Sequence, residues 1–140
     1  MNYRFIFLML LICGCLCLGG CGGKYSDVIE VNDQYIEAME SFISDLEKAD
    51  TPKAMAAGIN SFTDKMEEIG PQMAKIAKKY PELKDQSSLP KELEETQARA
   101  EEVGKRFAGA FMKIMRFMES DEVRKAQARL QTSMQGMMQR

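Results

Sequence analysis

The sequence predicts an all-α protein, an antiparallel helical bundle of three long helices plus a short C-terminal helix. Apolar residues recur at alternating steps of four and three over long stretches, and prolines and small polar residues stand at the ends of those stretches. No stretch shows the period-two alternation of a half-buried strand. The chain has 140 residues, which is enough for one such domain with its own core.

The first helix is predicted to begin near Asp27. Asp27 and Glu30 have the spacing of a capping box, in which two side chains bond the free backbone N–H groups of the first turn. The apolar residues of this helix are Val28, Tyr35, Met39, Phe42 and Leu46, with Ile29, Ile36 and Ile43 alongside.

The second helix has the clearest ends. Thr51 suits the N-cap, Pro52 the first helical position, and Pro81 stops the helix. Gly70-Pro71 lies inside it, but the apolar pattern keeps its phase there, so we expect a kinked, continuous helix. The pattern consists of Met55, Ile59, Phe62, Met66, Ile69, Met73, Ile76 and Tyr80.

The third and fourth helices follow the longest predicted loop, residues 81–90, which is bounded by prolines. Ser120-Asp121 has the composition of a cap and predicts a break before the short fourth helix. The third helix carries Leu93, Thr96, Ala100, Val103, Phe107, Ala110, Ile114 and Phe117, and the fourth carries Val123, Leu130, Met134 and Met137.

The C-terminal half of the third helix has a wider apolar arc than one neighbour needs. The additional residues are Gly104, Ala108, Phe111 and Met115. Such an arc faces two neighbouring helices, or one neighbour and a partner. Ala100, Gly104 and Ala108 form a small-residue track that predicts close packing inside the bundle, with an oligomer interface as the alternative. Outside the arc lie four basic residues that suit a solvated face or anionic lipid head groups: Lys105, Arg106, Lys113 and Arg116.

The composition argues against an enzyme. Histidine is absent, which excludes Ser-His-Asp and Cys-His nucleophiles as well as zinc sites built from histidine. The adjacent carboxylates Glu67-Glu68, Glu94-Glu95 and Glu101-Glu102 point about 100° apart on a helix and suit a solvated face. We therefore predict no catalytic, cofactor-binding or metal-ligating residue. The net charge of −2 does not favour nucleic acid as a partner.

The 12 methionines leave one alternative open. Met112, Met115 and Met118 are three residues apart, and Met134, Met137 and Met138 lie near the C-terminus. Thioethers are soft ligands that suit Cu(I), but methionine also fills irregular gaps in helical cores. Core filling is the prediction, and a small-ligand or Cu(I) site is the alternative.

The N-terminus has the pattern of a secretory signal peptide. Arg4 precedes an uncharged apolar stretch, residues 5–18, and the small residues Gly19 and Gly20 follow. All four cysteines lie in the first 21 residues: Cys13, Cys15, Cys17 and Cys21. A chain without residues 1–20 would keep only one of them and would have no disulfide of its own.

Leu18-Gly19-Gly20-Cys21 resembles the lipobox of bacterial lipoproteins. The resemblance implies diacylglycerol on the Cys21 sulfur, cleavage after Gly20, and acylation of the freed amine. An uncleaved membrane anchor is the alternative, because residues 5–23 carry no charge. The chain then divides into a cleaved signal peptide (1–20), a lipidated N-terminus with a short tether (21–26), and the helical bundle domain (27–140).

The same resemblance gives the expected location. In enteric bacteria an aspartate after the lipidated cysteine signals retention in the inner membrane, and this chain has Gly22 there. We therefore expect a lipid-anchored envelope protein on the periplasmic face of the outer membrane. The expected function is a non-enzymatic adaptor, assembly or structural module, coiled-coil-like in its packing, that binds a protein partner through a helix face.

Overall fold

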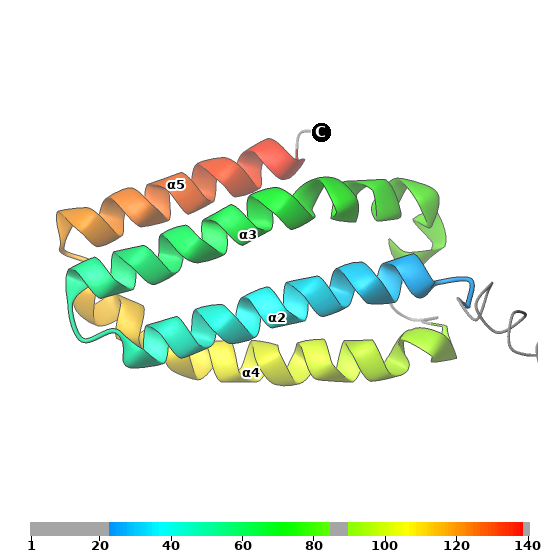
Figure 1. Cartoon of the computed structure of the whole chain (residues 1–140), viewed down its shortest axis with the longest axis horizontal. Helices are drawn as coiled ribbons and strands as arrows, with labels where there is room; N and C mark the ends of the chain where they lie inside the picture. The colour runs from blue at the N-terminus through cyan, green and yellow to red at the C-terminus, as the bar shows by residue number, and fades with distance from the viewer. Residues whose placement is uncertain (1–22, 85–89, 139–140) are drawn as a thin grey trace, which may run out of the picture.

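A computed structural model of the protein describes residues 23–84 and 90–138. Within these ranges the chain forms four α-helices and two short 3-10 turns, with no strand, which confirms the all-α bundle. The helices are α2 (Ser26–Lys48), α3 (Pro52–Lys79), α4 (Glu94–Phe117) and α5 (Asp121–Met138), and the 3-10 turns are η1 (Pro81–Lys84) and η3 (Lys91–Leu93). Consecutive helices run in opposite directions (Figure 1). None of the described helices is long and apolar enough to cross a membrane.

Most predicted helix ends are confirmed by local hydrogen bonds. The Thr51 hydroxyl accepts from the Ala54 N–H at 3.2 Å and Pro52 begins α3, while Val123 N–H donates to the Ser120 hydroxyl at 3.2 Å ahead of α5. Helix α3 continues through Pro71, as predicted. Part of the predicted loop, residues 85–89, lies outside the described residues.

The predicted capping box is wrong. Helix α2 begins at Ser26 with Tyr25 at the N-cap, and no side chain caps it. Asp27 instead accepts hydrogen bonds from Lys79 and Tyr80 at the far end of α3. A long-range partner for the Asp27 carboxylate has replaced the local one that the spacing suggested.

The four helices lie side by side in the order α4, α2, α3, α5 (Figure 1). Helices α2 and α3 form the central antiparallel hairpin. Helix α4 packs on the outer side of α2 and runs in the same direction as α2, and α5 does the same on α3. Neighbours in space are therefore not always neighbours in sequence.

The core lies along the central hairpin and extends onto both outer helices. Ile36, Ile43, Leu46, Met55 and Ile59 are almost fully buried on α2 and α3, and Val123 from α5 is fully buried as well. Phe42 of α2 stacks on Phe62 of α3 with ring centroids 4.5 Å apart. The predicted apolar pattern is wrong at Met73 and Met134, which are more than one third exposed.

A ladder of charged contacts sets the register between α2 and α4. Arg99 pairs with Asp33 at 2.7 Å, Arg106 lies 3.8 Å from Glu40, and the Lys113 ammonium donates to the Glu47 carbonyl. Successive contacts are one heptad apart on both helices, and the residue numbers rise in the same direction along both helices. The contacts therefore require a parallel pair with coiled-coil-like spacing.

Candidate functional site

Helix α4 carries two apolar stripes, each at heptad spacing. The first stripe faces α2, and its Val103, Ala110 and Ile114 are at most 6 % exposed. The second stripe is the first shifted by one residue along the chain. It consists of Gly104, Ala108, Phe111, Met115 and Met118, and we call it the second seam.

The second seam lies on the surface of the bundle. Phe111 is 42 % exposed and Met115 51 %, and the neighbouring Met112 reaches 68 %. No atom lies within 4 Å of the position that a Cβ on Gly104 would occupy, apart from the residues beside it in its own helix. The prediction that the small-residue track packs inside the bundle is therefore wrong at Gly104, and the oligomer interface stays as a prediction.

Exposed large apolar side chains concentrate on this helix. Of the six recorded in the described residues, three belong to α4 and a fourth directly follows it, and together they cover barely two turns: Phe111, Met112, Met115 and Met118. Single apolar residues on a surface are ordinary, but a contiguous group marks a surface used for binding. The second seam and Met112 are therefore the candidate site.

A row of packed aromatic rings connects this surface to the core. The Phe111 ring lies 5.9 Å from Phe107, which lies 5.8 Å from Phe42 in α2, and Phe42 stacks on Phe62. A side chain supported by such a row loses little conformational freedom when a partner covers it. The exposed face of Phe111 is thus already positioned for binding.

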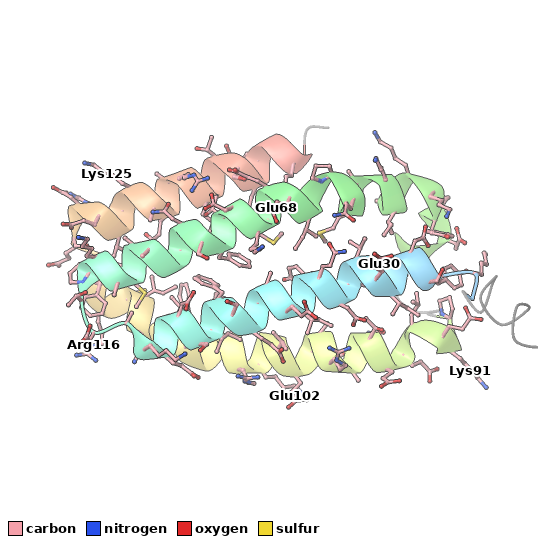
Figure 2. All side chains as sticks on the ribbon, viewed as in Figure 1. Glu30, Glu68, Lys91, Glu102, Arg116 and Lys125 are labelled. Carbon is pink, nitrogen blue, oxygen red and sulfur yellow. The ribbon has the colours of Figure 1, made fainter. Side chains whose placement is uncertain are left out.

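Charge is distributed unevenly along α4. Glu94, Glu95, Glu101 and Glu102 lie in its first nine residues, whereas the segment 103–117 has four basic residues and no acidic one. Arg106 and Lys113 are engaged with α2, which leaves Lys105 and Arg116 beside the second seam. Glu102 lies near the middle of α4 and Arg116 near its C-terminal end (Figure 2).

A second structural feature fixes the start of the described chain to the bundle. The Tyr25 and Tyr80 rings are 5.2 Å apart and buried, and the Tyr80 hydroxyl lies 2.8 Å from both the Lys24 carbonyl and an Asp27 carboxylate oxygen. Lys24 pairs with Glu82 at 3.0 Å, and Lys79 pairs with Asp27 at 2.7 Å. We call these residues the tyrosine clamp.

The clamp alters the titration of its charged groups. Hydrogen bonds from Lys79 and then Tyr80 hold the pKa of the Asp27 carboxyl below its ordinary value of 3.8. The hydrogen bond to Asp27 raises the pKa of Lys79 in turn. Both groups are therefore charged at neutral pH, and the ion pair persists there.

An apolar groove opens next to the clamp. It has a volume of about 370 Å³ and lies between α2, the end of α3 and the start of α4. Its walls include Val28, Val31, Met73, Ile76, Leu83 and Leu93. It is separate from the second seam, which occupies the other half of α4.

The structure separates the two methionine groups of the Cu(I) alternative, whereas Met112, Met115 and Met118 stay together at the C-terminal end of α4. Met112 lies on α4, whereas Met134 and Met137 lie toward the end of α5, at the opposite edge of the bundle (Figure 1). The Met137 side chain packs over Gly70. No cluster of three or more histidine, cysteine or acidic residues suited to a metal ion occurs among the described residues.

The remaining predicted site residue is the lipid attachment point, Cys21. Cys21 lies outside the described residues, two positions before Gly23. The adjacent carboxylates singled out in the sequence do not converge on a common site: Glu67 is 3.3 Å from Arg129, and Glu68 is 3.4 Å from Lys65.

Comparison of the chain with protein-family models, with curated proteins and with solved structures found no match.

Proposed function

We propose that the chain is a lipid-anchored bacterial envelope protein that binds a protein partner through the second seam of α4 and has no enzymatic activity. The proposed lipid attachment point is Cys21, and the proposed cellular location is the periplasmic face of the outer membrane. The observation that carries the binding role is the group of exposed apolar side chains on α4, with Phe111 at 42 % and Met112 at 68 % exposure.

The tyrosine clamp supports an anchored role. Lys24 and Tyr25 are held by the end of α3 and by η1, so only Gly22 separates Cys21 from the folded part at Gly23. A tether this short spans less than about 10 Å when extended. A lipid on Cys21 would therefore hold the clamp end of the bundle at the membrane surface.

The sharpest test of the anchor is Cys21→Ala. We expect this variant to lose labelling with radioactive palmitate and to accumulate as an uncleaved precursor, because both processing steps need the thiol. Cys17→Ala serves as the matched control and should label normally. Undiminished labelling of Cys21→Ala would contradict the anchor.

The binding role is tested separately by crosslinking in intact cells. A photoreactive residue in place of Met112 should capture a defined protein, because this side chain projects from the proposed surface. The control position is Met134, which is 46 % exposed on α5. Equal capture at both positions, or none at Met112, would contradict a binding role for the second seam.

A further inference from the structure

We infer that the partner of the second seam is a second copy of this chain, and that the two α4 helices pair antiparallel across a two-fold axis. The inference rests on the proposed binding role of the second seam and names its partner.

The second seam is small at one end and bulky at the other. Gly104 and Ala108 occupy its N-terminal part, and Phe111, Met115 and Met118 its C-terminal part. An antiparallel pair places Ala108 opposite Phe111 of the second copy and Gly104 opposite Met115 of the second copy. Phe111 and Met115 then each meet a small residue of the second copy, which lets the two helix surfaces interlock.

The open space at Gly104 agrees with this arrangement. Glycine in the middle of a helix costs about 1 kcal/mol relative to alanine. Nothing inside the bundle uses the space above Gly104, because no atom of another element comes within 4 Å of a Cβ placed there. A methionine from a second copy would fill that space.

The charges of α4 select the antiparallel orientation over the parallel one. The acidic first turns of one copy lie beside the basic last turns of the other, so Glu101, which lies about 60° around the helix from Gly104, comes to the level of the second copy's Arg116. A parallel pair would place acids beside acids and bases beside bases, which is unfavourable.

The tethers fit a pair anchored in one membrane. Each tether starts beside the first turn of α4, where Gly23 lies next to the Glu92 side chain. If the two-fold axis lies along the membrane normal, both α4 helices run parallel to the membrane and both tethers reach the same leaflet. A helical rise of about 1.5 Å per residue places the two tethers roughly 45 Å apart. Confinement to one membrane raises the effective concentration and favours pairing.

Cysteine crosslinking of the full chain distinguishes the orientations. Gly104→Cys and Met115→Cys, expressed together in one cell, should form a mixed disulfide under mild oxidation. Gly104→Cys expressed alone should not crosslink, because the two Gly104 positions of an antiparallel pair lie roughly 16 Å apart along the axis. A crosslink of Gly104→Cys with itself, and none in the mixture, would overturn the antiparallel pair.

The oligomeric state of the purified full chain in mild detergent completes the test. We expect a dimer by light scattering, a monomer for Met115→Glu, and an unchanged dimer for the matched surface variant Met134→Glu. Helical content should be the same in all three, because both methionines are exposed. A monomeric parent chain, or a dimer that survives Met115→Glu, would overturn the inference.

The same measurements on Cys21→Ala separate the inference from the anchor. The variant should still give the mixed disulfide, because α4 and its second seam are unchanged. Loss of palmitate labelling without loss of pairing would concern the anchor alone. Capture of a different protein at Met112 by a monomeric chain would keep the binding role and overturn self-association.

Discussion

Phenylalanines of the same chemistry differ in what they contribute, because the fold buries them to different extents. Phe62 is 9 % exposed and stacks on Phe42, whereas Phe111 is 42 % exposed and touches only the edge of the core through Phe107. The sequence predicted a buried position for Phe62 from its spacing. It left Phe111 in an arc that could face either a second helix or a partner.

Phe62→Ala should lower the free energy of unfolding by about 3–5 kcal/mol, the usual cost of removing a buried phenyl ring. Phe111→Ala is the matched control and should cost about 1 kcal/mol or less, because much of its ring is already in water. Urea denaturation followed by circular dichroism measures both values. Equal losses for the two variants would contradict the burial described here.

At the scale of helices, the caps and the spacing determine the ends of the elements. The sequence predicted the helix ends at Thr51, Pro52 and Ser120 correctly, because a cap depends on neighbours within about four residues. The capping box at Asp27 was misread because its actual partners, Lys79 and Tyr80, lie more than fifty residues away. Local spacing carries no information about such contacts.

The register of α2 against α4 did leave a signal in the sequence. Asp33, Glu40 and Glu47 are one heptad apart, and so are Arg99, Arg106 and Lys113. Two complementary charge series at the same period indicate a parallel helix pair. The order of helices across the bundle left no such signal, because a heptad stripe shows that a neighbour exists but not which helix it is.

The tyrosine clamp should weaken in acid. The pKa of the Asp27 carboxyl is lowered in the folded state, so its stabilisation is complete above its ordinary value of 3.8 and is lost as the pH falls through the folded pKa. Asp27→Asn should therefore lower the melting temperature by a few degrees at about pH 7, and the difference should be smaller at a pH well below 3.8. The ion pair of Asp33 with Arg99 provides the comparison, since Asp33→Asn leaves the clamp intact. A difference between parent and Asp27→Asn that is the same at both pH values would contradict a charged Asp27 in the clamp.

At the scale of the whole molecule, the arrangement leaves the two ends of α4 with different surroundings. Its first turns lie beside the tether and the apolar groove, and its last turns carry the exposed part of the second seam. The sequence predicted an apolar arc too wide for one neighbour, and the structure shows which part of it stays uncovered. Residues on the first stripe are covered because α2 packs against them through the apolar core. No helix of the described chain covers the second seam to the same extent, because α5 packs on α3 at the opposite edge.

We propose that the second seam, although exposed in the isolated fold, is covered by a protein in the cell. The most direct measurement is labelling of single cysteines with a membrane-impermeant maleimide, in intact envelopes and in the purified, diluted chain. We predict that Met115→Cys is protected in envelopes and reacts after dilution, whereas Met134→Cys reacts equally in both. Equal reactivity of Met115→Cys in envelopes and after dilution would contradict the account.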